Sequence, residues 1–284
     1  MTDIQMSSVV EAVAVKPVGH FSTRRLNLES LGLLSRPVMR FDHYRMSGKT
    51  FSPSPHAGYA LISYVLNTSK GALRCRDSLN NDLTLEPGDL LWSQASSGLI
   101  HDEYPARPGH TVEALQICVN LKSFNKRRPP EVSWVNAEMI PTVADNLGSE
   151  IKILCGRYLD TSGAIEQAEP FDLLDVAISN EFEYTPRNNN NFLIYVLEGD
   201  VQINRLGNLT SIKQYEAIAG KLERAHESVT IGANKPSRLL LLSGSDPNEE
   251  IASYGTFIMN SESEITEALD RYRKGEMGRL MPLR

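Results

Sequence analysis

Residues 82–92 read DLTLEPGDLLW, and this stretch decides the fold class. Leu83 and Leu85 alternate with polar neighbours, which is the period of a half-buried strand. The following residues, Pro87-Gly88-Asp89, are those of a tight turn. The apolar run 90–92 then begins a second strand. The stretch therefore predicts strand, turn and strand.

The same alternation recurs further along the chain. Residues 113–121 read EALQICVNL, with apolar side chains at positions 115, 117, 119 and 121 and Gln116 and Asn120 on the other face. We expect Gln116 to be either a satisfied buried amide or a support for a nearby site. Between about residues 41 and 254, short apolar stretches are separated by Gly, Pro, Asn and Asp. This pattern predicts an all-β chain of sandwiches or barrels.

An internal repeat indicates two domains. Residues 63–66 read SYVL and residues 194–197 read IYVL, 131 positions apart, and each is followed by a glycine and a second apolar stretch. Both segments are predicted to form the same hairpin, and a repeat of this length indicates a domain duplication. We expect domains at 1–135 and 136–284, with the proline-containing segment 129–141 as the junction.

One helix is predicted near the C-terminus. Ser261 is a favourable N-cap, and Glu264 three residues later completes a capping box. Ile265, Leu269 and Tyr272 then form one apolar stripe. We expect this helix to pack against the outside of a barrel.

Composition excludes several classes of partner. The 284 residues carry a net charge of −6, which argues against direct nucleic-acid binding, and no apolar run is long enough for a membrane span. Residues 1–15 contain no basic leader. The three cysteines are far apart and lack CxxC spacing, which fits a reducing compartment. We expect a cytoplasmic protein without a membrane partner.

Two histidines occur in informative settings. His101 and Glu103 are alternate residues of one segment, and Ser54 and His56 are alternate residues of another. Alternate residues of a strand project to the same face. If the two strands are neighbours, two imidazoles and one carboxylate converge, which is the ligand set of non-haem iron(II) oxygenases. Spacing alone leaves this site open, because it does not establish that the strands are adjacent.

An ordered set of motifs resembles the pirin family. Residues 53–66 contain Pro-His-x-Gly before the SYVL strand, and residues 98–105 read GLIHDEYP. Residues 87–92, 115–121, 240–244 and 254–260 also resemble pirin stretches. The resemblance extends from about Pro37 to Leu280. It implies two cupin (jelly-roll-like) β-barrels in one chain, followed by the C-terminal helix.

The resemblance also implies iron in the N-terminal barrel only, held by three histidines and one glutamate. His56, His101 and Glu103 match three of these ligands, whereas Ser54 stands at the fourth and Ala57 replaces the family's arginine. A serine hydroxyl is a poor ligand for a divalent transition metal. Three outcomes are open: a weaker three-ligand Fe²⁺ site, a site completed by water, or an empty pocket. The second barrel is expected to be metal-free, because its matching run, 188–191, offers no imidazole and because neighbouring positions 226 and 227 would face opposite ways on a strand.

Two functions follow from the resemblance. The first is an iron-dependent dioxygenase of the quercetin 2,3-dioxygenase type, in which Glu103 takes the proton of a flavonol-like substrate. The second is a non-catalytic module, regulatory or binding a small molecule or a protein, with a degraded or empty metal site. The intact pair of His101 and Glu103 favours the enzyme, and Ser54 with Ala57 favours the module.

Overall fold

The computed structural model describes residues 4–187, 190–205, 208–222 and 227–281. Strands dominate the chain, and the longest helix, α2 (Glu262–Arg273), lies near the C-terminus. The all-β class with one C-terminal helix, which the alternation and the capping box predict, is therefore confirmed. No helix among the described residues is long and apolar enough to cross a membrane.

The chain divides into two compact units. The N-terminal unit consists of residues 14–25, 38–138 and 247–284, and the C-terminal unit of residues 1–13, 26–37 and 139–246. Each unit thus includes a segment from the opposite end of the sequence, and α2 belongs with the N-terminal unit. The division of the chain into cupin domains at residues 135 and 136 stays a prediction.

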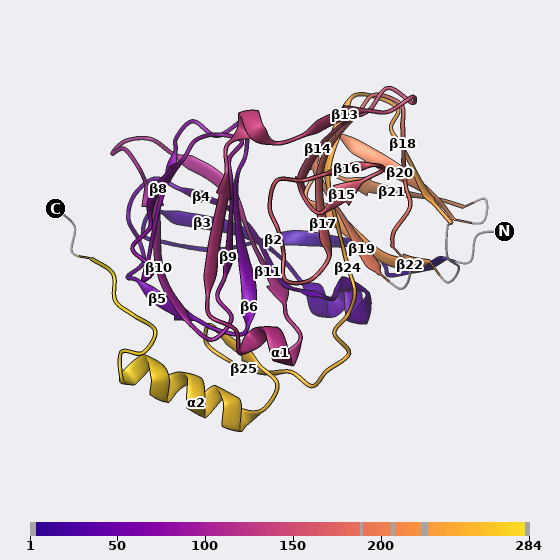
Figure 1. The fold of residues 1–284 in the computed structure, drawn as a ribbon. Helices are drawn as coiled ribbons and strands as arrows, with labels where there is room; N and C mark the ends of the chain where they lie inside the picture. Colours follow the sequence, from indigo (N-terminus) through magenta and orange to yellow (C-terminus); the bar gives the residue numbers. More distant parts are fainter. Residues whose placement is uncertain (1–3, 188–189, 206–207, 223–226, 282–284) are drawn as a thin grey trace. The chain divides into compact units, whose positions relative to one another are not determined.

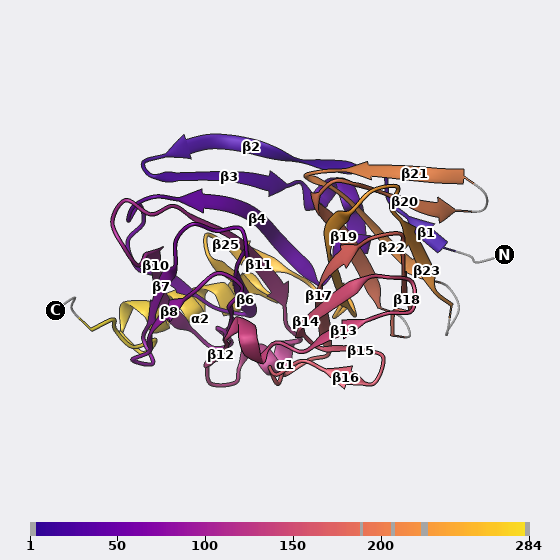
Figure 2. The ribbon, with the colours of Figure 1, turned by 90° about the horizontal axis from the view of Figure 1, so that it is seen from above.

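The N-terminal unit contains two antiparallel sheets (Figures 1 and 2). One sheet has the order β12-β9-β6-β11-β4-β3-β2, and the other has the order β5-β10-β7-β8. The bounds are β2 (Val10–Val18, of which residues 14–18 belong to this unit), β3 (Phe21–Leu26), β4 (Val38–Met46), β5 (Ser54–His56), β6 (Tyr59–Val65), β7 (Leu73–Asp77), β8 (Asp82–Leu85), β9 (Leu90–Gln94), β10 (Leu99–Pro105), β11 (Val112–Asn120) and β12 (Glu131–Val135). The unit also contains α1 (Ser123–Lys126), β25 (Ala252–Tyr254) and β26 (Phe257–Met259).

The interior of this unit is apolar at one end and polar at the other. A core cluster includes Tyr44, Val65, Leu85, Leu91 and Ala114. Beside it, strand register aligns a polar row, since Asp42 pairs with Arg25 on β3 and with Gln116 on β11, and Gln116 pairs with Ser63 on β6. Burial of apolar side chains stabilises the unit. The polar row marks the part of the unit in which polar side chains take the place of this apolar core.

The C-terminal unit repeats the arrangement of two sheets. One sheet has the order β22-β19-β24-β17-β14-β13 with β1 also paired to β22, and the other has the order β18-β23-β20-β21. Its bounds are β1 (Ile4–Met6), η1 (Leu28–Ser35), β13 (Thr142–Ala144), β14 (Glu150–Cys155), β15 (Arg157–Tyr158), β16 (Thr161–Ser162), β17 (Phe171–Ile178), β18 (Glu181–Tyr184), β19 (Asn191–Glu198), β20 (Asp200–Arg205), β21 (Asn208–Lys213), β22 (Glu216–Leu222), β23 (Val229–Gly232) and β24 (Ser237–Gly244). A large core of aliphatic and aromatic side chains lies inside it.

The predicted hairpins are wrong. β6 pairs with β9 and β11, whereas β7, the next strand, pairs with β8 and β10 in the other sheet. The same crossing separates β19 from β20 in the C-terminal unit, so the repeat is real but its strands lie in different layers. The local pattern shows that two strands follow each other, and it does not show which strands pair. For the residues that the structure describes, the strand pairings of each unit do not close into one hydrogen-bonded barrel.

The C-terminal helix begins as its sequence predicts. The Ser261 side chain accepts a hydrogen bond from the Glu264 backbone N–H over 3.3 Å. Ile265 and Ala268 are buried and pack in a cluster with Ala57, Phe257 and Met259, whereas Tyr272 is 40% exposed. The helix lies beside β25 and β26 (Figure 1). It therefore covers the segment that follows β5.

Candidate functional site

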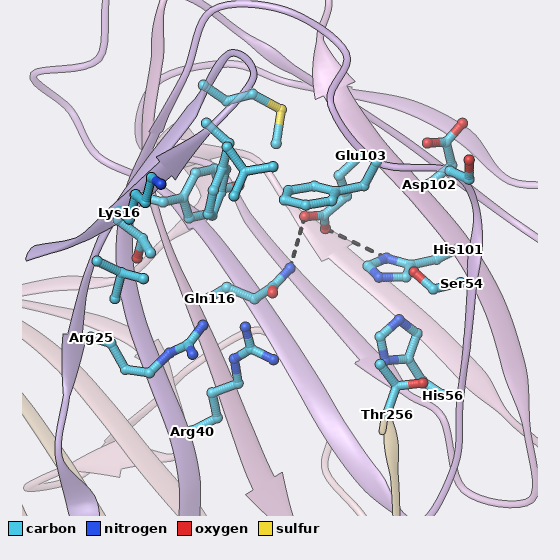
Figure 3. A pocket seen from close by; sticks show the side chains of 18 residues that line it. Lys16, Arg25, Arg40, Ser54, His56, His101, Asp102, Glu103, Gln116 and Thr256 are labelled. Carbon is cyan, nitrogen blue, oxygen red and sulfur yellow. Dashed lines mark hydrogen bonds and ion pairs between the residues drawn. The ribbon is translucent and has the colours of Figure 1, made fainter. Parts of the chain in front are cut away.

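A cavity of about 370 Å³ opens into the N-terminal unit (Figure 3). Its size is at the lower end of the range for small-molecule sites. All four residues of the predicted site region, Ser54, His56, His101 and Glu103, line it. Strands β5 and β10 supply these side chains.

Antiparallel pairing of β5 with β10 gathers the side chains on one face. His101 lies opposite Ser54, and Leu99 lies opposite His56. The His56 and His101 rings meet edge to face, with centroids 4.4 Å apart. The adjacency that spacing alone left open is therefore present, and Ser54 occupies the same face.

His56 presents one ring nitrogen to the cavity. The ring is buried, and Nδ1 forms a short hydrogen bond with the Tyr59 hydroxyl. Among the described residues, Nε2 has no hydrogen-bond partner although it is buried. Burial, followed by the charges of His101 and Arg40, holds the pKa of His56 well below its usual value. A neutral imidazole whose Nδ1 donates to Tyr59 carries a lone pair on Nε2, which suits a metal or a hydrogen-bond donor.

Glu103 is held from several sides. Ser63 Oγ donates to Oε1 over 2.6 Å, and Gln116 Nε2 donates to Oε2 over 3.1 Å. His101 Nδ1 lies 3.7 Å from Oε1 (Figure 3). Buried polar groups normally have partners, and here the partners orient the carboxylate toward the histidines.

The donor set fits a divalent transition metal in part. Two imidazoles and one carboxylate share one face, and His56 Nε2 is an unpartnered buried donor atom. Within the described ranges, no three His, Cys, Asp or Glu side chains are already gathered closely enough to hold an ion. Each oxygen of the Glu103 carboxylate accepts a hydrogen bond, from Ser63 or from Gln116, and keeps a further lone pair for an ion. A metal centre here requires the three donor side chains to move closer together.

Sequence reasoning missed several residues of the cavity. The opposite sheet contributes Arg25 and Gln116 of the polar row to the lining, together with Arg40, which lies two residues before Asp42 on β4. Of the two roles expected for Gln116, the structure places its amide on Glu103. The residues of this row are distant in sequence, so only strand register reveals them.

The prediction for the second barrel stays a prediction. Asn188, Asn189 and His226, on which it partly rests, lie outside the described residues. Asn190 and Asn191 are buried, and Asn191 Nδ2 donates to the backbone oxygens of Leu33 and Arg36. Asn191 therefore has a structural role within the C-terminal unit.

Comparison with known proteins gives consistent matches. The family model described as "Pirin" matches residues 21–119, and the one described as "Pirin C-terminal cupin domain" matches residues 173–278. A "Pirin-like protein" from Solanum lycopersicum is 30% identical over 246 residues, which cover 85% of this chain and 82% of that protein. The two-cupin prediction is confirmed by the two family models.

Solved structures share the fold. The crystal structure of a quercetin 2,3-dioxygenase from Acinetobacter baumannii superimposes with a TM-score of 0.82 at 25% identity, covering 98% of this chain and 99% of that one. The Escherichia coli protein YhhW, a bacterial pirin solved in complex with nickel(II), gives a TM-score of 0.66 at 16% identity, with coverage of 86% and 100%. The second likeness shows the fold alone.

Proposed function

Because this chain belongs to the pirin family, we propose that it is a metal-dependent oxidoreductase of the quercetin 2,3-dioxygenase type. One observation carries the proposal: the unpartnered Nε2 of His56 lies in a cavity that His101 and Glu103 also line. The similarity to the Acinetobacter baumannii quercetin 2,3-dioxygenase supports it as an analogy of fold and family.

The ligands proposed are His56, His101 and Glu103. They would hold Fe²⁺ or another divalent transition metal, with Ser54 beside them in place of a fourth protein ligand. A bound divalent metal would supply Lewis acidity toward the oxygens of a flavonol-like substrate and toward dioxygen. Every other contribution comes from the chain.

Glu103 is the proposed proton acceptor. Its carboxylate lies in the cavity, where a substrate hydroxyl can reach it, and Ser63 and Gln116 fix its position. A base works when it is within hydrogen-bond reach of the proton that it removes. The oxygen that receives the proton must be one that the metal leaves available.

Tyr59 and the cavity walls position the reacting groups. The Tyr59 hydroxyl fixes the His56 ring through Nδ1, so Nε2 keeps its direction. Phe21 and Phe51 pack edge to face with ring centroids 5.0 Å apart, and both line the cavity. These rings provide an apolar wall for a planar substrate and keep water away from it.

A binding module is the second candidate, and one observation favours it. Both Glu103 oxygens are engaged by Ser63 and Gln116, so the site is stable as a hydrogen-bonded network without an ion. Ser54 offers no strong ligand in compensation. In this function the cavity would recognise a small molecule or report its presence to a protein partner.

Metal content separates the two candidates. The wild-type protein is loaded with Fe²⁺ under argon, desalted and subjected to elemental analysis, and oxygen uptake is followed with quercetin. His101→Ala should lose the metal, whereas His110→Ala, an exposed histidine outside the cavity, should retain it. A wild-type protein that retains no metal, or that retains metal without oxygen uptake, supports the binding module. Unchanged metal content in His101→Ala contradicts the proposed site.

A further inference from the structure

The wall opposite the histidines carries two guanidinium groups around one buried carboxylate. Arg25 Nε lies 2.7 Å from Asp42 Oδ1, and Arg40 Nε lies 2.5 Å from Asp42 Oδ2. The Asp42 side chain is 2% exposed, whereas those of Arg25 and Arg40 are 45% and 43% exposed. The carboxylate is therefore enclosed, and both cations face the cavity (Figure 3).

Asp42 orients the arginines and leaves most of their donors available. A guanidinium has five N–H groups in a planar fork. The Asp42 carboxylate accepts hydrogen bonds from Nε and Nη2 of Arg25 and from Nε of Arg40. Two cations and one anion leave a formal charge of +1 at this wall, and Lys16 lines the same cavity. Fixed guanidinium forks are well suited to a carboxylate.

Tyr44 adds an unpartnered donor to the same wall. Its side chain is buried and lines the cavity. In the described part of the chain, its hydroxyl has no hydrogen-bond partner. Burial, followed by the charge of Glu103, raises the pKa of Tyr44 well above its usual value, so the hydroxyl remains protonated. A buried hydroxyl without a hydrogen-bond partner destabilises the protein. A ligand that accepts a hydrogen bond from this hydroxyl would remove the destabilisation.

The same wall also carries aromatic rings. The Phe21 ring lies 5.3 Å from the Tyr44 ring and 5.0 Å from the Phe51 ring, measured between centroids. A flat ring can pack against such a surface. Cations, an unpartnered donor and an aromatic surface thus occur together in one cavity.

We propose that this cavity binds an aromatic carboxylate, with the acid group on Arg25 and Arg40 and the ring against Phe21 and Tyr44. A hydroxyl of the same ligand would then point toward Glu103 and His56. The proposal names a substrate class for the proposed function and rests on that function for the reaction, but not for the binding. An uncharged flavonol offers these guanidinium groups hydrogen-bond acceptors but no opposite charge.

A matched pair of ligands tests the acid group. Isothermal titration at low ionic strength compares 2-hydroxybenzoate with 2-hydroxybenzamide, which has a similar shape but no charge. The wild-type protein, with chelator present, should bind the acid at least about tenfold more tightly, the effect of one charge-assisted hydrogen bond. Equal affinities would overturn the proposal.

Variants of the wall test the residues. Arg40→Gln should lose the preference for the acid, while Asp42 keeps Arg25 as its partner. Asp42→Asn should bind the acid more tightly, because the wall gains a positive charge. Arg45→Gln, an exposed arginine on the same strand that does not line the cavity, is the matched control. The two opposite effects cannot both arise from misfolding.

The result can be separated from the proposed oxidation. If the acid binds as expected but neither metal nor oxygen uptake is found, the anion site stands and the dioxygenase proposal is wrong. If the acid binds only after metal is added, and Arg40→Gln has no effect, the acid binds the ion. In that case the anion site is wrong and the metal site is supported.

Discussion

Gln116 Nε2 donates a hydrogen bond to Glu103 Oε2 over 3.1 Å, and this bond links the two sheets of the N-terminal unit across the cavity. Gln116 belongs to β11 and Glu103 to β10. Ser63 Oγ holds the other carboxylate oxygen from β6. The two short hydrogen bonds to the residue proposed as base and ligand therefore come from the opposite sheet, while His101 and Cys75 of its own sheet lie 3.7 Å and 3.8 Å from Oε1.

Gln116→Ala should weaken metal binding. Without the amide, the Glu103 carboxylate loses one of the two bonds that orient it, and loss of such a support costs about 10–100-fold in metal affinity. The dissociation constant is measured by competition with a coloured chelator. Gln214→Ala, whose amide contacts the Leu197 backbone in the C-terminal unit, is the control. An affinity that rises in Gln116→Ala would mean that Gln116 keeps Glu103 away from the ion.

Local alternation was sufficient to predict the strands and part of the site. Leu83 and Leu85 follow the predicted period in β8, and His101 and Glu103 share a face as alternate residues do. The pairing of strands was not predictable in the same way. Every residue of β6 is buried, so its sequence does not distinguish the inner face from the outer face.

The opposite wall shows why the rest was missed. Arg25 and Asp42 are 17 positions apart, and Asp42 and Gln116 are 74 apart. Neither pair forms a local motif, because the residues meet only through the register of three strands. A charged residue in an isolated strand is ordinarily read as solvent-exposed. Only the three-dimensional arrangement identifies these residues as part of one cavity.

Glu113→Gln should lower stability in a pH-dependent way. His43 Nε2 lies 3.3 Å from Glu113 Oε1, and chiefly this hydrogen bond holds the pKa of Glu113 below its ordinary value. A carboxylate whose pKa is lower in the folded state stabilises the fold above its unfolded pKa, and the effect is lost as pH falls through the folded pKa. We expect a loss below about 1 kcal/mol at pH 7, as for a partly exposed pair.

Urea unfolding at pH 7 and near pH 3 measures this difference. The difference in free energy of unfolding between Glu113→Gln and wild type should be smaller at the acidic pH. Glu131→Gln, which removes an exposed carboxylate 3.6 Å from Arg128, should change stability less. A gap that widens in acid would show that the pair with His43 is not its source.

Gly58→Ala should destabilise the N-terminal unit and disturb His56. Gly58 has φ = +88°, and a Cβ there would lie 1.7 Å from the Ile258 backbone oxygen. The substitution combines backbone strain, about 1–3 kcal/mol, with a collision against β26. The melting temperature in thermal unfolding and the metal affinity should both fall.

Gly109→Ala is the matched control for this substitution. Gly109 also has a positive φ, of +78°, but no atom lies within 4 Å of its added Cβ. Gly109→Ala should therefore lose only the stability that backbone strain costs. Equal losses in the two variants would mean that the close approach of Ile258 to Gly58 contributes nothing.

Ser54→His is the most direct test of the metal site. Ser54 lies opposite His101 in the β5–β10 pair and lines the cavity, so an imidazole there can join the proposed ligands. A change outside the ligand set alters metal affinity about 10–100-fold, and a new ligand should do at least as much. Fe²⁺ affinity should rise by that factor in the chelator competition, and oxygen uptake with quercetin should increase if the chemistry is limited by metal loss.

Ser52→His, exposed but also at the cavity, is the control for a nearby imidazole that is not paired to β10. Tighter binding without oxygen uptake would support the binding module and direct attention to Ala57, which stands where the resemblance predicts an arginine. An unchanged affinity would mean that the ion, if one binds, does not lie beside the paired positions of Ser54 and His101.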